Sequence, residues 1–259
     1  RVAAIRALTD NLPMNNRGHE GSRAFPEFPH LAKSDPSGLV RLALASALHR
    51  LTLDDRPSVA AALLAHAEDA EDHNIRWVIW TGIKDILRHR PTDLIALAEN
   101  SKIPLIQRNI ARRVAEDFIS YRNQIEPLLG IAQKAPAPAA AEIIGGIADG
   151  LRGYRQAMKP AAWDAITKQF ADTTDTTLAT RIRELSVVFG DGRALDEIRR
   201  IALDDSTALG QRRSALITLI DNRAPDLRKL CEQLLGHRDL GGVAARGLAL
   251  SDDPGVGEL

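Results

Sequence analysis

Two tryptophans on one predicted helix are the residues best placed for binding chemistry. Trp77 and Trp80 stand three residues apart, in an apolar stretch that also contains Arg76. Residues three apart lie on the same side of a helix, so the two indole rings could form an aromatic surface for a peptide or a flat ligand. The interpretation that we favour is structural, because tryptophans with this spacing also pack between neighbouring repeats.

A second group of candidates is basic. Arg108, Arg112 and Arg113 follow helical spacing and would form a basic stripe along one helix. This stripe could contact an anion or a phosphate, or it could pair with carboxylates of neighbouring repeats and with nearby Glu116 or Asp117. We favour ion pairing as the interpretation. The candidate binding surface comprises Arg76, Trp77, Trp80, Arg108 and Arg112.

No residue pattern predicts a catalytic, cofactor-binding or metal-binding site. The seven histidines lack the spacing of a helical zinc site, and the chain has neither a glycine-rich phosphate loop nor a nucleophile elbow. The single cysteine, Cys231, occupies an apolar helical position, which predicts a buried and inert thiol. Gly145, Gly146 and Gly150 lie in an apolar helical stretch and would allow close contact between helices. We therefore expect no enzyme activity and no cofactor in this segment.

Short helices must position these residues. Apolar residues recur at spacings of three and four along the chain, as in residues 75–87 and 227–235. No comparable stretch alternates with a period of two. Aromatic residues make up only 4% of the sequence, and alanine and leucine fill the apolar positions, Leu48 among them. The sequence predicts an all-α fold with almost no strand.

The helix starts recur in register. A turn with Asp, Pro, Ser or Asn precedes an apolar helix that carries an early arginine, as in Asp35, Pro36 and Ser37 before Arg41. Such starts lie about 30 to 40 residues apart, which is the spacing of two-helix repeats. One helix pair cannot bury its apolar stripe alone, so pairs stack. We predict a right-handed α-α superhelix of HEAT/armadillo type with about seven helix pairs; a compact helical bundle is the alternative.

The domain prediction is a single solenoid segment over residues 1–259, cut from a longer chain. The sequence begins with Arg1 rather than Met and begins inside a helical pattern, so residues 1–8 would be the second helix of a repeat. Residues 15–30 have no helical period and many turn formers. We predict an irregular loop or insertion there.

Charge and hydropathy limit the expected partners. Lys plus Arg and Asp plus Glu both number 34, so the formal net charge is zero. Nucleic-acid binding proteins usually carry a basic excess, and nucleic acid is therefore not an expected partner. No apolar stretch reaches about 18 residues, so no membrane partner is expected either.

Three stretches resemble a known protein family. They read DPSGLVRLALASALHRL (35–51), DDRPSVAAALLAHAEDAEDHNIRWVIWTGI (54–83) and SKIPLIQRNIARRVAED (101–117). They are similar to the HEAT-repeat region of PVC-type heme-binding proteins, which are large exported proteins of planctomycetes and relatives. In that family the repeats lie between a dehydrogenase-like β-propeller and a c-type cytochrome domain with a CxxCH motif. The resemblance covers most of the chain and is strongest from Asp35 to Asp117.

The resemblance implies a non-catalytic scaffold that links these two domains in a larger redox protein, exported or periplasmic. Heme c would belong to the parent protein, because Cys231 is not part of a CxxCH motif. The partners would be flanking domains of the same chain or another protein. One alternative is a stand-alone protein- or peptide-binding HEAT scaffold. Another is a DNA-repair glycosylase on a HEAT-like solenoid, which Trp77, Trp80 and Arg112 allow and which the zero net charge opposes.

Overall fold

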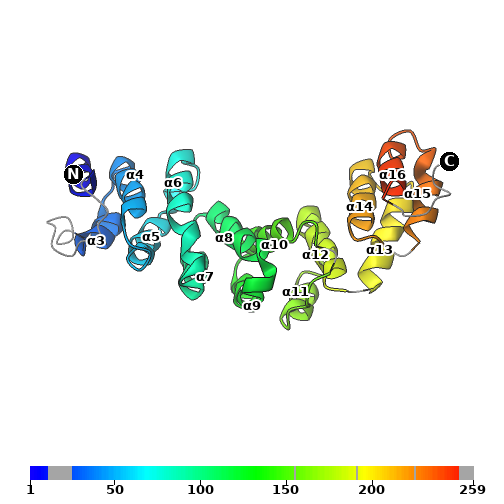
Figure 1. Ribbon diagram of the computed structural model, residues 1–259, viewed down its shortest axis with the longest axis horizontal. Coiled ribbons are helices and arrows are strands. Elements are labelled where there is room, and N and C mark those ends of the chain that lie inside the picture. The colour runs from blue at the N-terminus through cyan, green and yellow to red at the C-terminus, as the bar shows by residue number, and fades with distance from the viewer. Residues whose placement is uncertain (11–24, 155, 191, 225, 251–259) are drawn as a thin grey trace. The chain divides into compact units, whose positions relative to one another are not determined.

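The computed structural model describes residues 1–10, 25–154, 156–190, 192–224 and 226–250, and every regular element in these ranges is helical (Figure 1). Fifteen α-helices and three short 3-10 helices account for them. No strand is present in the described ranges, which confirms the predicted all-α fold.

The first helices are α1 (Val2–Asp10), α3 (Glu27–Ser34), α4 (Gly38–Ala47), α5 (Arg56–Leu64), α6 (His73–Ile83), α7 (Pro91–Asn100), α8 (Pro104–Glu116), α9 (Phe118–Lys134), α10 (Ala137–Gly150) and α11 (Trp163–Gln169). The later helices are α12 (Thr176–Val188), α13 (Gly192–Leu203), α14 (Leu209–Asp221), α15 (Leu227–Leu235) and α16 (Gly241–Leu248). The 3-10 helices are η1 (Leu48–Arg50), η2 (Ala67–Asp69) and η3 (Lys84–Arg88).

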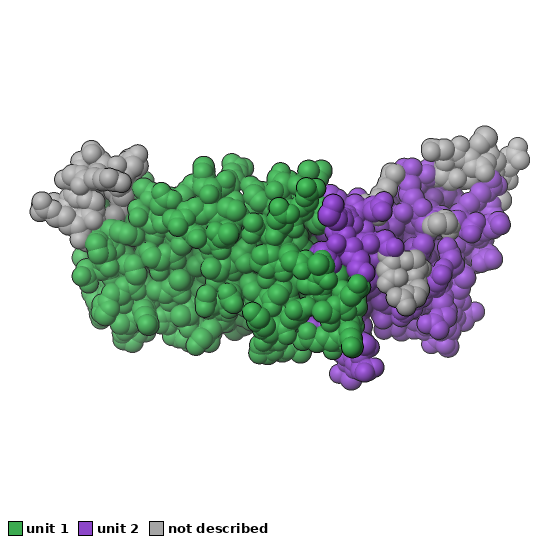
Figure 2. Space-filling view, turned by 90° about the horizontal axis from the view of Figure 1, so that it is seen from below, with its two compact units in different colours: residues 1–150, 161–169 green, residues 151–160, 170–259 purple. Residues whose placement is uncertain are grey.

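The described chain divides into two compact units (Figure 2). Unit 1 comprises residues 1–150 and 161–169, and unit 2 comprises residues 151–160 and 170–259. Gly150 ends α10, and the described part of residues 151–160 forms no helix. The single solenoid segment over residues 1–259 stays a prediction.

The helices of unit 1 pack in two rows. The first row contains α3, α5, α7, α9 and α11, and the second row contains α1, α4, α6, α8 and α10; each helix contacts the next one in its row. Each first-row helix from α3 to α9 also contacts the second-row helix that follows it. Figure 1 shows α4 and α6 on one side and α5 and α7 on the other. Stacked helix pairs of this kind are compatible with an α-solenoid.

Helix α4 of the second row is buried over much of its circumference. Six of the ten residues of α4 are buried, and Leu48 directly after α4 has no exposed surface. The sequence pattern predicted this, because α4 reads as almost continuously apolar. Helices that are covered on several sides need small side chains at their closest contacts, and alanines supply these in α4.

The loop predicted for residues 15–30 differs from the structure at its end. Helix α3 begins at Glu27 and includes His30, so its first turn lies within the range predicted as irregular. The reason is tertiary packing: Phe28 is almost fully buried, and its ring makes an edge-on contact with that of Phe25. Residues 15–24 lie outside the described ranges.

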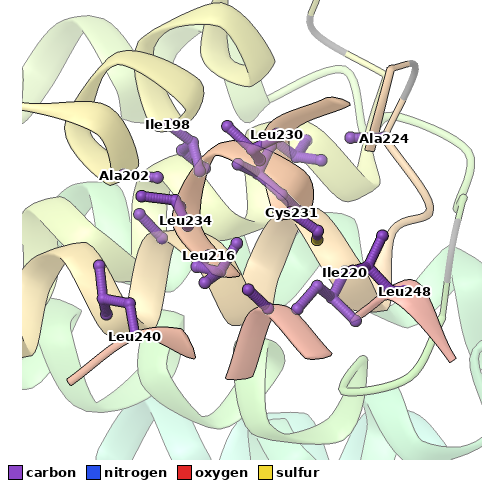
Figure 3. Packing of buried hydrophobic residues seen from close by; sticks show 14 of the residues in the cluster. Ile198, Ala202, Leu216, Ile220, Ala224, Leu230, Cys231, Leu234, Leu240 and Leu248 are labelled. Carbon is purple, nitrogen blue, oxygen red and sulfur yellow. The ribbon is translucent and has the colours of Figure 1, made fainter. Parts of the chain in front are cut away.

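Unit 2 contains α12, which packs on α13, and two helix pairs around one apolar core (Figure 3). Helix α13 packs on α14, α15 packs on α16, and α14 also contacts α16. Cys231 lies in this core with no exposed surface, as the sequence predicted, and burial raises the pKa of its thiol. A Cβ atom added to Gly247 would lie 2.6 Å from the Cys231 Sγ and 2.9 Å from Ile220, so glycine allows α16 to approach this closely.

Candidate interaction surface

Arginine clamps connect successive repeats of unit 1. Arg41 on α4 is almost fully buried and donates from its Nε and Nη2 to the two carboxylate oxygens of Asp69, both at 2.6 Å. Its Nη1 donates to the Asp35 carbonyl at 3.2 Å. Asp35 precedes α4, whereas Asp69 precedes α6. Arg41 therefore ties its own turn to the turn of the following repeat.

The fourth residue plays a comparable role in other second helices. Gln107 is the fourth residue of α8 and donates to the carbonyls of Ala98 and Ser101. Arg212 is the fourth residue of α14; its Nε donates to the Ala202 carbonyl at 3.2 Å. Each of these side chains is buried and bonds to backbone just before its helix. The fourth residue of these helices therefore has a structural role. It also marks equivalent positions by which the second helices can be aligned with one another.

Arg76, the fourth residue of α6, is the exception. Its Nε is buried and has no hydrogen-bond partner among the described residues. The next buried turn residue, before α8, is Ser101 instead of an aspartate. The serine hydroxyl is used within its own turn, since it donates to the Ile103 carbonyl and accepts from the Ile103 N–H. Arg76 is therefore left without the carboxylate that Arg41 has.

The two tryptophans of α6 have different surroundings. Trp77 is 60% exposed, although a core residue was one of the two interpretations. Trp80 is half-buried. It directly precedes Thr81 and Gly82, which contact η1. Only Trp77 therefore presents most of its ring to solvent.

Two contacts with η1 fix how α6 is rotated about its own axis. A Cβ on Gly82 would lie 2.8 Å from the Cβ of Leu48, and the Thr81 hydroxyl lies 3.1 Å from the Nε2 of His49. Helix α6 thus points Thr81 and Gly82 toward the end of α4. Because each helical residue turns by about 100°, Arg76 and Trp80 lie on the side of α6 that faces α8. Trp77 lies between these two sides and faces outward.

The basic stripe on α8 is neutralised by ion pairs. Arg108 donates from Nε and Nη2 to one carboxylate oxygen of Asp149 on α10, at 3.0 and 2.6 Å, and lies 3.5 Å from Glu142. Arg112 and Arg113 lie 2.8 and 4.0 Å from the Glu116 carboxylate. The ion-pairing interpretation is confirmed for all three arginines, and Arg108 joins two neighbouring second-row helices.

Helices α8 and α10 approach each other closely at two glycines. A Cβ atom on Gly146 would collide with the backbone carbonyl of Arg108 and lie 2.9 Å from the Ala111 Cβ. A Cβ atom on Gly150 would lie 2.6 Å from the Ala115 Cβ. Two alanines therefore oppose two glycines, each pair four residues apart. This confirms that the glycines serve close helix contact.

His49, whose ring lies beside the Thr81 hydroxyl of α6, has a shifted pKa. Partial loss of water around the ring is the largest effect, and the positive charges of Arg56, Lys84 and Arg50 add to it, so the pKa of His49 lies below its ordinary value of 6.5. The ring is therefore neutral at pH 7.

Within the described ranges, no group of three or more His, Cys, Asp and Glu side chains is arranged to hold a metal ion. None of the described helices combines the length and the apolar character that a membrane crossing requires. Carboxylates near helix starts serve as turn residues: Asp55 accepts from the Thr52 hydroxyl at 2.6 Å, and Asp204 accepts from the hydroxyls of Ser206 and Thr207.

The sequence candidates do not form one cluster. Trp77 is exposed, Arg76 and Trp80 lie toward α8, and Arg108 and Arg112 are engaged in ion pairs. The sequence did not lead to Leu39 and Leu105 as candidate surface residues, although both are exposed. Each lies two residues before a buried fourth residue, Arg41 or Gln107, and this shared position would have identified them. The chain matches no protein-family model, no curated protein and no solved structure, so its resemblance to the heme-binding proteins stays a prediction.

Proposed function

We propose that the chain is a non-catalytic α-solenoid scaffold that binds protein through the outward residues of α4, α6 and α8. The observation that carries the proposal is the 60% exposure of Trp77 in the middle of an otherwise well-packed helix. A large aromatic ring left in water is costly for a scaffold with no partner, and tryptophan is among the residues that contribute most to protein interfaces.

The proposed architecture is a right-handed α-α superhelix of HEAT/armadillo type with about seven helix pairs. The two-row packing of unit 1 and the helix pairs of unit 2 support it. The shared role of Arg41, Gln107 and Arg212 as buried fourth residues supports repetition of one structural motif.

The proposed setting is a longer redox protein, in which this scaffold links a dehydrogenase-like propeller to a c-type cytochrome domain. The stretches 35–51, 54–83 and 101–117 are its support, through the family resemblance. The coding sequence on either side tests it. A β-rich domain upstream and a CxxCH motif downstream would support this setting, and the absence of both would remove it without affecting the binding surface.

Protein binding is tested by affinity capture from a lysate of the source cells with matched variants. We expect Trp77→Ala to fail to capture the proteins that the unchanged chain captures. Trp80→Ala should lose fewer of them. Ile119→Ala is the control, because Ile119 is a 79% exposed apolar residue at the start of α9. If Trp77→Ala and Ile119→Ala captured the same proteins as the unchanged chain, this function would be wrong.

A further inference from the structure

Unit 2 has a surface hollow between its helices α14 and α16. The hollow has a volume of about 270 Å³, and Ile217, Ile220 and Val243 form its apolar part. Ile217 is 40% exposed, and Gly242 is open to solvent, since a Cβ atom there would contact nothing within 4 Å. The α14–α16 hollow is thus an accessible apolar depression among the described residues of unit 2.

Helices α14 and α16 run parallel along this hollow. Near their starts, the Arg212 Nη1 lies 3.4 Å from the Nε2 of His237, which precedes α16. Near their ends, a Cβ atom on Gly247 would lie 2.9 Å from the Ile220 side chain. The middle of α14 therefore lies beside the middle of α16.

Four charged side chains line the two ends of the hollow, two of each sign. Arg213 on α14 and Asp239 before α16 lie at the starting end. Asp221 and Arg246, near the last residues of α14 and α16, lie at the other end. All four are exposed, and within the described ranges their side chains form no hydrogen bond or ion pair. Charge therefore runs from positive to negative along α14 and from negative to positive along α16.

The neighbouring charges leave this balance of signs in the hollow unchanged. Arg212 is almost fully buried and lies 2.7 Å from Asp205. Arg223 after α14 and Arg238 before α16 are exposed but do not line the hollow. A partner with one sign of charge, such as an acidic segment or a nucleic-acid strand, would be repelled by two of the four side chains. The arrangement favours a partner that carries both signs with the same spacing.

The same surface on a second copy of this chain meets that requirement. A two-fold axis that crosses both helices at their middles would place α14 antiparallel to α14 of the second copy, and α16 antiparallel to its α16. Arg213 would then lie opposite Asp221 of the second copy, and Asp239 opposite its Arg246. Residues 213–221 and 239–246 cover about 12 and 10.5 Å at the helical rise, so one axis serves both pairs.

We propose that the chain forms a two-fold symmetric dimer through the α14–α16 hollow of unit 2. Ile217 lies four residues from both Arg213 and Asp221, so it stands at the axis against the same residue of the second copy. Burial of Ile217 and Val243 supplies affinity. The ion pairs are exposed and chiefly fix the orientation. This inference does not depend on the binding surface proposed for α4, α6 and α8.

Sedimentation equilibrium of the full chain over a concentration series measures the dimer. We expect a monomer–dimer equilibrium whose dissociation constant rises at least about tenfold in Asp221→Arg and in Arg213→Asp, because each change places like charges in two symmetric contacts. Ile217→Ala should raise it about fivefold or more. All three side chains are exposed, and circular dichroism verifies that each variant is folded.

Charge exchange separates pairing between copies from a local effect. In the double variant Arg213→Asp with Asp221→Arg, the opposed charges attract again, so the dimer should recover. An equimolar mixture of the two single variants should form a mixed dimer, because the two arginines of one copy face the two aspartates of the other. Lys229→Asp removes an exposed cation from α15, outside the hollow, and should dimerise like the unchanged chain.

Three outcomes would overturn the proposal. A monomer at every concentration would show that the hollow does not bind a second copy. A dimer that both single variants leave unchanged would show that the copies associate through another surface. If neither the double variant nor the mixture restored association, Arg213 and Asp221 would not face each other across the axis.

Discussion

The guanidinium group of Arg41 binds both carboxylate oxygens of Asp69, which lies 28 residues later in the chain. Both side chains are almost fully buried, at the junction between one helix pair and the next. The early arginine of this repeat therefore binds the turn of the following repeat. In unit 2, by contrast, Arg212 lies 2.7 Å from Asp205 in the turn before its own helix. Ser101 stands in the turn before α8 at the place where the turn before α6 has Asp69. Arg76 therefore has no carboxylate partner of the kind that Arg41 has.

Asp69→Asn should destabilise unit 1 by about 3–5 kcal/mol, because it leaves the buried Arg41 without its counter-charge. Urea denaturation followed by circular dichroism measures the change. The double variant Arg41→Met with Asp69→Leu should recover most of the loss, since it removes both charges. A loss below about 1 kcal/mol in the single variant would mean that the pair behaves like a solvent-exposed one.

Gly146→Ala should destabilise the chain because the new methyl group collides with the Arg108 backbone, and α10 must move away from α8. We expect a loss of about 1–3 kcal/mol, as for other overpacked sites. Gly130 on α9 is the matched control, since its Cβ would contact nothing within 4 Å. Gly130→Ala should stabilise its helix by about 0.5–1 kcal/mol. Equal effects at both glycines would contradict the close approach of α8 and α10.

Cys231 should resist thiol reagents in the folded chain, because it has no exposed surface and burial raises the pKa of its thiol. Absorbance during reaction with an aromatic disulfide reagent at pH 8 measures this. We expect no reaction over minutes in buffer and complete reaction of one thiol per chain in denaturant. Rapid stoichiometric reaction without denaturant would show that the α15–α16 core of unit 2 is open.

Acidification should weaken the fold through His49. Its folded pKa lies below the ordinary value of 6.5, so the unfolded chain takes up the proton first as the pH falls. The stability that neutral His49 contributes is thus present above about pH 6.5 and is lost below it. Thermal melts at about pH 7.5 and 5 should show a smaller drop for His49→Asn than for the unchanged chain. An equal or larger drop in the variant would contradict this assignment.

Much of the fold could be predicted from the sequence. Helical periodicity and the turn before Arg41 indicated helix pairs, and the apolar surroundings of Cys231 indicated its burial. The beginning of α3 was missed because the contact between Phe25 and Phe28 has no periodic signal.

The candidate surface was only partly predictable. Spacing alone places Trp77 and Trp80 on one side of a helix, but exposure depends on how α6 turns against α4, which contacts distant in sequence decide. The partner of Arg108 is 41 residues away on α10, so no local pattern could identify it. Leu39 and Leu105 become recognisable only after Arg41 and Gln107 are aligned as equivalent positions.

The central claim is that helix pairs of unit 1 stack as a one-dimensional array, in which each pair is stabilised by its neighbours. Leu48→Ala tests it, because Leu48 is fully buried against Gly82 of α6 and its truncation should cost about 2–5 kcal/mol. Hydrogen exchange followed by mass spectrometry measures protection helix by helix. We expect faster exchange in α4, α5 and α6 with near-normal protection in α9 and α10. Uniform loss of protection across all helices of unit 1 would instead indicate a single cooperative core and contradict the account.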